Sequence, residues 1–379
     1  MKKILIIHNR YQNQGGEDVA VENEINFLKK YYLVEEIIFE NRFKNYISEI
    51  VYLLIGNNYK SARLVKNKIN SFSPDVVYVH NTWFKASLSI FKVLQKEKIP
   101  LLIKLHNFRY LCTSAFLSKK HLNGKKFCSA CGYSESKNGI INKYFKDSWT
   151  KSFLILVYGK KYLSILKKDN IKILVLTEFH KKLLSKYKEM QNKVFVFPNL
   201  IDIEIKPSVE KENSIVYAGR ISEEKGIEQL INAFLSSNLP GVKLKIIGEG
   251  PMLKELKNKY PQHNQIEFFN FIKNFEVLKH ISTSMAVVSA TKLYEGQPTL
   301  LCEASLLGIP SVYPSTGGID EFFPNSYELS YRQFDYQDLI IKLKLLSDKK
   351  KIEIIGLDNK KFIQDYLNRD NIIKKFKEI

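Results

Sequence analysis

Two glutamates, Glu295 and Glu303, with seven residues between them, are the sharpest chemical feature of the sequence. Glu303 is the only charged residue between Pro298 and Pro310, where its neighbours are Leu, Cys and Ala. Proline suits the first position of a helix, and Gly308 suits its end. A carboxylate on such an apolar, buried helix needs a partner, because an unpaired buried charge is expensive. The sequence therefore predicts either an internal salt bridge at Glu303 or a pair of ligand hydroxyl groups.

The start of that helix could bind an anion. Helix N-termini offer free N–H groups, and because Pro298 has none, Thr299 and Leu300 would supply them. At a rise of 1.5 Å per residue, Glu303 would lie about 7.5 Å beyond the helix start. One ligand could then meet Glu295, the helix end and Glu303 in turn, an order that fits a sugar, a diphosphate and a ribose.

A second segment carries two cations, Arg220 after an expected strand and Lys225 at the start of the next helix. Two cations at the carboxyl edge of a sheet suit a diphosphate. Taken alone, an ordinary strand–helix turn with exposed charges is the simpler interpretation.

The elements around these residues follow an α/β rhythm of short apolar runs and helix-period segments. Such runs indicate parallel sheets covered on both faces. The expected strands span residues 3–7, 33–39, 75–80, 100–106, 171–177, 193–197, 214–218, 242–247, 265–271, 286–289 and 310–313. The expected helices include residues 17–32, 85–98, 223–235 and 362–376.

A polar stretch near residues 199–213 reads as a linker between two doubly wound, Rossmann-like parallel-sheet domains that face a central cleft. We expect an amino-terminal domain over 1–200, with a Cys-containing insertion at about 107–150. A carboxyl-terminal domain would span 201–360, and a last helix over 361–379 would pack back on the amino-terminal domain.

Composition excludes several classes of protein. The chain has 379 residues, 45% of them hydrophobic and 26% charged, which is typical of a globular protein of two or three domains. No run reaches the roughly 18 apolar residues of a spanning helix. The net charge is +20, yet only seven of the 59 basic residues are arginine, whereas nucleic-acid binders favour arginine. The lysines form either a solvated surface or one attracted to anionic lipid.

Together the Glu–seven residues–Glu and Gly-Arg…Lys-Gly elements resemble the retaining glycosyltransferases of family 4, which have the GT-B fold. Gly317-Gly318 resembles the glycine pair that follows the next strand of that family. The resemblance implies that Arg220 and Lys225 hold a donor diphosphate, that Glu303 binds the ribose and that Glu295 contacts the transferred sugar. The chain departs from the family at Gly296-Gln297-Pro298, where many members have Gly-Phe-Gly. The implied donor-binding residues are Gly16, Gly219, Arg220, Lys225, Phe271, Gly296, Thr299, Leu300 and Glu303.

The amino-terminal half carries a second set of candidates. Gly15 and Gly16 follow the first strand and would let backbone approach a ligand closely, although a flexible turn explains them equally well. His8, His80 and His106 are each expected at the carboxyl end of a strand. The resemblance implies an active-site role for His106, and it assigns Gly15, Gly16 and His80 to the acceptor side. The implied catalytic residues are His106, Glu295, Arg220 and Lys225.

Three cysteines, Cys112, Cys128 and Cys131, have the spacing Cys-x15-Cys-x2-Cys within the insertion. They read either as reduced thiols or as three ligands of a structural zinc site. The resemblance puts a fourth Cys where this chain has Tyr144, and His121 could substitute. No Asp-x-Asp motif suggests a catalytic divalent ion, and we expect no cofactor besides the nucleotide-sugar substrate.

The resemblance implies a metal-independent hexosyltransferase that moves sugar from a UDP- or GDP-linked donor to a saccharide acceptor, lipid-linked, in bacterial surface polysaccharide biosynthesis (capsule, O-antigen or exopolysaccharide). The chain would be cytoplasmic, or peripheral at the inner face of the cell membrane. The helix expected over 149–168 mixes aromatic and basic residues and is either an interfacial element or a core helix with solvated lysines. A GT-B sugar-nucleotide epimerase and a basic protein that binds nucleic acid or anionic surfaces are the alternatives. The sequence leaves open the sugar, the base, the acceptor and the oligomeric state.

Overall fold

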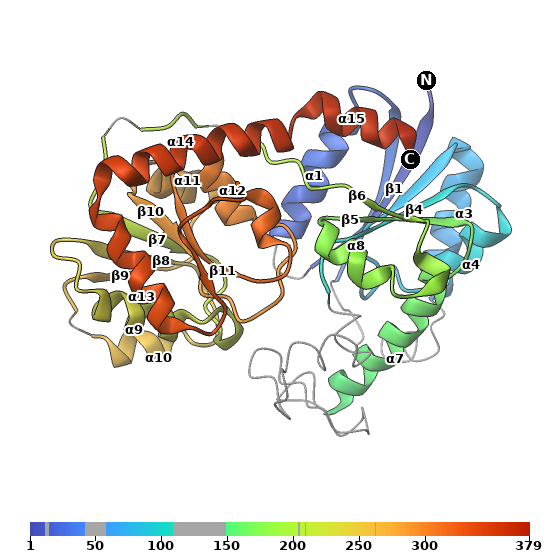
Figure 1. Cartoon of the computed structure of the whole chain (residues 1–379). Helices are drawn as coiled ribbons and strands as arrows, with labels where there is room; N and C mark the ends of the chain where they lie inside the picture. Colours follow the sequence, from blue (N-terminus) through green and yellow to red (C-terminus); the bar gives the residue numbers. More distant parts are fainter. Residues whose placement is uncertain (12–14, 42–57, 109–148, 204, 209, 262) are drawn as a thin grey trace. The chain divides into compact units, whose positions relative to one another are not determined.

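The computed structural model describes residues 1–11, 15–41, 58–108, 149–203, 205–208, 210–261 and 263–379. The chain forms two compact units, Met1–Leu200 with Ile373–Ile379, and Ile201–Ile372. Each unit contains a six-stranded sheet in which every strand pair is parallel, with helices on both faces (Figure 1). This confirms the predicted pair of Rossmann-like domains.

The first unit has the strand order β2-β1-β3-β4-β5-β6. Its strands are β1 (Lys3–Arg10), β2 (Leu33–Glu40), β3 (Val76–Val79), β4 (Leu101–Leu105), β5 (Ile171–Val175) and β6 (Val194–Val196). Its helices are α1 (Gly16–Leu28), α3 (Tyr59–Phe72), α4 (Ser89–Lys96), α7 (Trp149–Leu166) and α8 (Glu178–Leu184). The order of the strands reverses at β1, so the loops after β1 and β3 meet at the switch point where such sheets bind ligands.

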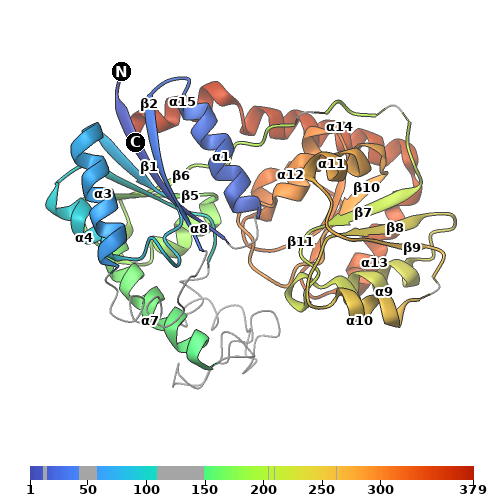
Figure 2. The same ribbon diagram turned by 180° about the vertical axis from the view of Figure 1, so that it is seen from behind.

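Helices cover both faces of this first sheet. Helix α1 lies on one face and α3 with α4 on the other, as the two opposite views show (Figures 1 and 2). The face under α1 is completed by the end of α15 (Arg369–Glu378), where the Phe376 ring lies 5.8 Å from the Tyr78 ring and 5.5 Å from the Phe197 ring. Residues far apart in sequence therefore share this layer of the core.

The second unit has the order β12-β11-β10-β7-β8-β9. Its strands are β7 (Ser214–Ala218), β8 (Lys243–Ile247), β9 (Ile266–Phe269), β10 (Ala286–Val288), β11 (Ser311–Ser315) and β12 (Ser330–Arg332). Its helices are α9 (Ile227–Ser237), α10 (Leu253–Lys259), α11 (Asn274–Thr283), α12 (Thr299–Leu306), α13 (Tyr336–Lys344) and α14 (Lys349–Tyr366). The order reverses between β7 and β10, the Rossmann arrangement, so the loops after these two strands meet.

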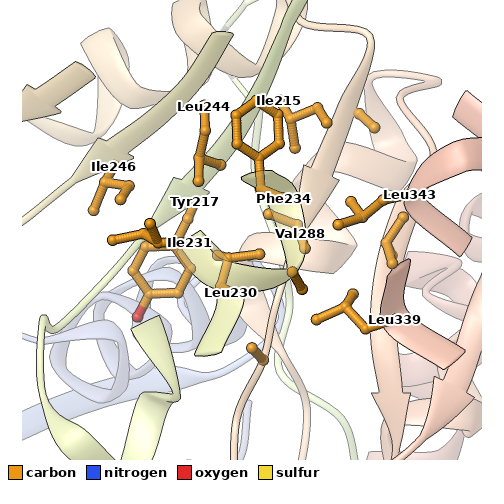
Figure 3. Close-up of a cluster of buried hydrophobic side chains, with 14 of the residues drawn as sticks. Ile215, Tyr217, Leu230, Ile231, Phe234, Leu244, Ile246, Val288, Leu339 and Leu343 are labelled. Atoms are coloured by element: carbon orange, nitrogen blue, oxygen red, sulfur yellow. The ribbon is translucent and has the colours of Figure 1, made fainter. Parts of the chain in front are cut away.

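Alternating side chains build the core of this unit. Ile215 and Tyr217 of β7 belong to one buried cluster with Leu230 of α9 and Leu339 of α13 (Figure 3). Val216, between them in sequence, belongs to the opposite layer with residues of α11 and α12. Because both faces of each strand are covered, the strands read as continuous apolar runs, which is why the sequence located them.

Two elements differ from the sequence-based expectation. The helix expected over 362–376 is the end of α14 followed by α15, because the Asn368 side chain accepts hydrogen bonds from the backbone N–H groups of Asp370 and Asn371 and starts a new helix. Only residues 373–379 of the expected terminal segment belong to the first unit. The expected helix over 223–235 begins as a 3₁₀ turn and turns sharply at Gly226 before α9.

Candidate active site at the switch point of the second sheet

The loop after β7 presents the two predicted cations. Arg220 has 68% of its side chain exposed and makes a long contact of 3.8 Å with Glu224. Lys225 ends the 3₁₀ turn, and its Nζ lies 2.6 Å from Oε1 of Glu295. The structure therefore brings Lys225 and Glu295 together as an ion pair, which the sequence did not anticipate.

Glu295 lies in the loop between β10 and α12. Its Oε1 also accepts a hydrogen bond of 2.9 Å from the Thr291 hydroxyl. Two glycines make this arrangement possible. Gly226 has a φ of 68°, and a Cβ there would lie 2.1 Å from the Ala290 carbonyl oxygen. Gly317 has a φ of 63°, and a Cβ there would lie 2.3 Å from the Glu295 carbonyl oxygen. Backbone packing thus fixes both ends of the ion pair.

Helix α12 begins beside this ion pair in sequence. Pro298 is its capping residue rather than its first helical residue, a small correction to the expectation, and its carbonyl accepts the N–H of Cys302. The first amides of the helix belong to Thr299 and Leu300, as predicted, and no side chain caps them. Unsatisfied N–H groups at the start of a helix favour an anion such as a phosphate.

Glu303 lies one turn further along α12 and is 7% exposed. Its Oε1 accepts a hydrogen bond of 3.2 Å from Nδ2 of Asn274, the first residue of α11. Among the residues that the structure describes, no lysine or arginine pairs with it. Burial raises the pKa of Glu303 to about 7, and the hydrogen bond from Asn274 opposes this rise. Of the two predicted alternatives, the internal salt bridge is therefore wrong within the described residues.

The end of β9 leads to the expected base-binding segment. Phe271 follows β9 and is 68% exposed. Gly219 and Gly296 lie in the two loops that meet at the switch point, as the sequence predicted.

The predicted histidines of the first unit lie at its own switch point. His80 follows β3, His106 follows β4, and Nδ1 of His80 lies 3.0 Å from Nε2 of His106. Burial, and after it nearby basic groups that include Lys104, hold the pKa values of both histidines well below their usual range. At neutral pH both rings are therefore uncharged, and a single proton lies between them.

His8 was expected at the end of its strand and instead lies inside β1, which continues to Arg10. Its Nε2 lies 2.8 Å from Oδ1 of Asp18, and Oδ2 of Asp18 accepts the backbone N–H of Gly15. Gly16 is the first residue of α1. The glycine pair is therefore held by the start of α1 rather than forming a loose turn.

Sequence reasoning missed a buried ion pair beside the histidines. Nζ of Lys104 lies 2.6 Å from Oε2 of Glu24, and the Tyr78 hydroxyl donates to Oε1 of the same carboxylate at 2.5 Å. Burial lowers the pKa of Lys104, and Glu24 opposes the shift. The signal was present, since each charged residue interrupts an apolar pattern, Lys104 in β4 and Glu24 in α1.

Sequence reasoning also did not single out Lys292. It follows β10, is 7% exposed, and takes part in no ion pair among the described residues. Its backbone N–H donates to the carbonyl of Glu224, which ties the loop after β10 to the loop after β7.

Two further sequence-based expectations concern metal and membrane. Cys112, Cys128 and Cys131 lie outside the described residues, within which no cluster of His, Cys, Asp or Glu side chains could hold a metal ion. None of the described helices is long and apolar enough to cross a membrane. In α7, Ile155 and Tyr158 are buried and Lys160 is exposed, as the alternative of a core helix with solvated lysines requires, while Phe153 is 40% exposed.

Comparison with known proteins finds a family that resembles the second unit. Residues 199–364 match the family model of glycosyl transferases group 1. This part of the chain is similar to that family. The switch-point residues Arg220, Lys225, Glu295 and Glu303 all lie within the matched segment.

Relatives cover more of the chain. An uncharacterized glycosyltransferase of Methanocaldococcus jannaschii is 27% identical over 280 residues, which are 68% of this chain and 59% of that protein. The amylovoran biosynthesis glycosyltransferase AmsD of Erwinia amylovora is 22% identical over 327 residues, 82% of this chain and 80% of AmsD. The chain thus spans less than two thirds of the first relative and four fifths of the second.

The solved structure of HepE from Anabaena in complex with UDP-glucose covers 100% of this chain and 99% of its own, with a TM-score of 0.70 and 15% identity. The likeness shows the GT-B fold. Both sequence relatives are named as glycosyltransferases, and AmsD is named for amylovoran biosynthesis. Membership of family 4 and the retaining mechanism stay predictions.

Proposed function

We propose that this protein is a retaining, metal-independent hexosyltransferase of family 4 that transfers sugar from a nucleotide-diphosphate sugar to a saccharide acceptor. The observation that carries the proposal is the order of groups at the switch point between β7 and β10. Glu295, then the two cations with the free amides of α12, then the buried Glu303 follow one another along this edge. A sugar, a diphosphate and a ribose need these groups in this order.

In this proposal Arg220, Lys225 and the amides of Thr299 and Leu300 hold the diphosphate. Their charge stabilises the leaving group, so the reaction has no need of a divalent ion. The Glu303 carboxylate accepts the ribose hydroxyl groups, and Gly296 leaves room for the diphosphate. The exposed Phe271 lies at the segment that receives the base.

In this proposal Glu295 both positions Lys225 and binds the transferred sugar. Its Oε1 already holds Nζ of Lys225 at 2.6 Å, which keeps the ammonium in place for the diphosphate. Among the described residues both hydrogen bonds of this carboxylate fall on Oε1, so the other oxygen is available to a sugar hydroxyl. The ion pair therefore links the sugar-binding group to the diphosphate-binding group.

These contacts would support a transfer step with retention of configuration. The bond between the anomeric carbon and the diphosphate oxygen breaks, and the acceptor oxygen forms its bond to the same face of the sugar. The acceptor proton passes to a phosphate oxygen of the departing nucleoside diphosphate. His106, kept uncharged by burial, and His80 belong to the first unit, where we assign the acceptor side to His80, Gly15 and Gly16.

The acceptor and the biological setting are also proposals. AmsD is named for amylovoran biosynthesis, and HepE was solved with UDP-glucose. These names support a UDP-linked donor and a role in bacterial polysaccharide assembly. From the family resemblance we extend the proposal to a GDP-linked donor and to a polyprenyl-linked saccharide acceptor. We place the enzyme in the cytoplasm, peripheral at the inner face of the membrane.

Turnover assays test the proposal. The purified protein is incubated with UDP- and GDP-hexoses, with EDTA, and with or without a lipid-linked saccharide. Product that retains the donor's anomeric configuration, seen by NMR only when acceptor is present, supports the proposal. Free sugar released without acceptor indicates a nucleotide-sugar epimerase, and absence of turnover with every donor indicates a binding protein.

A further inference from the structure

Asn274 is the residue that touches the Glu303 carboxylate. It opens α11, whereas Glu303 lies 29 positions later on α12, and the two helices pack against each other. The Asn274 side-chain amide donates to Oε1 at 3.2 Å. Among the described residues this is the only hydrogen bond recorded at the Glu303 side chain.

The placement of Asn274 sets it apart from an ordinary helix-surface asparagine. Asn274 itself is exposed, while Glu303 is buried, so the hydrogen bond reaches inward from the surface to the carboxylate. Three residues earlier, Phe271 stands 68% exposed at the segment proposed to receive the base. Asn274 therefore connects the segment proposed to receive the base with Glu303, the residue proposed to bind the ribose.

We propose that Asn274 is a positioning residue for nucleotide binding: its amide orients the Glu303 carboxylate and keeps it charged, so that the carboxylate can accept the two hydroxyl groups of a ribose. This inference rests on the proposed nucleotide-sugar function. An amide N–H donor stabilises a carboxylate more than a carboxylic acid. Removing the amide therefore costs both the orientation of Glu303 and its charge.

No other charged group takes this role among the described residues. Cys302, beside Glu303 on α12, titrates only far above neutral pH because burial raises its pKa. On α14, Asn359 is bonded to the Ser305 hydroxyl, and the Lys360 stem lies near Gly308 at the other end of α12. Strand β11 presents Tyr313, whose pKa is also raised by burial. The Asn274 amide is thus the group whose removal moves the titration of Glu303.

Calorimetry with UDP and GDP between pH 6 and pH 8.5 tests the inference. For the wild-type protein, affinity falls as pH drops through about 7, where Glu303 takes up a proton. In Asn274→Ala the affinity at pH 7 falls about 10-fold, because a hydrogen bond to a charged group is lost, and the pH midpoint moves upward. Asn274→Gln restores part of the affinity, and Asn274→Asp weakens binding most, because a second carboxylate raises the pKa of Glu303.

Two controls separate positioning from general damage. Asn232→Ala removes an exposed helix asparagine of the same unit that bonds the Tyr260 hydroxyl, and it should leave affinity and pH profile unchanged. In the Glu303→Gln background, Asn274→Ala should have no further effect on affinity, because the two side chains act as one unit. A 2′,3′-dideoxy nucleoside diphosphate should be insensitive to both variants.

The outcomes are distinguishable. If the wild-type protein binds neither UDP nor GDP, the proposed function is wrong. If it binds one of them while Asn274→Ala keeps wild-type affinity and an unshifted pH midpoint, the function stands and the positioning role of Asn274 is overturned. Additive losses in the double variant overturn it as well.

Discussion

At the scale of single residues, the diphosphate site depends on two cations with different surroundings. Arg220 is mostly exposed, whereas Lys225 is held by Glu295. We expect Arg220→Ala and Lys225→Ala each to lower kcat by about 10²–10³-fold, the usual cost of losing one donor to developing charge. Steady-state kinetics with the preferred donor measures the loss. The control Lys243→Ala removes an exposed lysine paired with Glu267 and should leave kcat unchanged; near-normal kinetics in both site variants would refute the diphosphate assignment.

The buried Glu303 carboxylate destabilises the folded protein when it is charged. Its pKa rises from 4.5 to about 7, so between these pH values the folded state holds a proton that the unfolded state releases. The free energy of unfolding therefore falls as pH rises through this window, by about 3 kcal/mol in total. We expect Glu303→Gln to raise the melting temperature at pH 8, to change it little at pH 4.5, and to weaken nucleoside diphosphate binding. Equal stability of the two proteins at pH 8 would show that the charge is not buried.

At the scale of elements, the turn between β7 and α9 sets the position of Lys225. Gly226→Ala would place a Cβ 2.1 Å from the Ala290 carbonyl oxygen, whereas Gly241→Ala, with a nearly equal φ of 69°, meets nothing within 4 Å. We expect Gly241→Ala to lower the free energy of unfolding by about 1 kcal/mol, the cost of the left-handed conformation. Gly226→Ala should add about 1–3 kcal/mol of overpacking and also reduce kcat. Chemical denaturation compares the two variants. Equal losses in the free energy of unfolding would mean that the backbone of the turn shifts to make room for the added Cβ at no extra cost.

The last helix contributes to the first unit. Phe376 is buried against Tyr78 and Phe197, so we expect Phe376→Ala to lower the free energy of unfolding by about 3–5 kcal/mol. Lys374→Ala, an exposed position on the same helix, should change it by less than about 0.5 kcal/mol. Hydrogen exchange locates the effect, which should be concentrated in β3 and β4; a uniform loss of protection would contradict it.

The sequence predicted most elements because their strands are buried on both faces and read as apolar runs. It also located Glu303, since one charge in an apolar helix is conspicuous. It missed Asn274, because a polar residue at an exposed helix start carries no local sign of its partner 29 positions later. It missed β12, whose three residues at the sheet edge are too few to show alternation. It read residues 362–376 as one helix because the apolar pattern continues through the cap at Asn368.

At the scale of the whole molecule, the net charge of +20 favours binding to anionic surfaces. We expect co-sedimentation with vesicles that contain anionic phospholipid at low salt and release at high salt, because screening shortens the range of the attraction. Neutral vesicles are the control. Since Ile155 and Tyr158 of α7 are buried, binding should depend on lysines rather than on insertion of these side chains. Absence of binding at low salt would leave a water-soluble acceptor as the better interpretation.

The chain leaves the first unit at Leu200 and returns to it at Ile373. The second unit is thus continuous in sequence, whereas the first is completed only by residues made after the second unit. On the ribosome, where domains fold as they emerge, the first unit to appear is the last to be finished. Until Phe376 arrives, the layer over Tyr78 stays open, and the buried pair of Lys104 and Glu24 beside it lacks its full cover. In a nascent chain halted before α15, the second unit should therefore resist protease, whereas the first unit should remain susceptible to it.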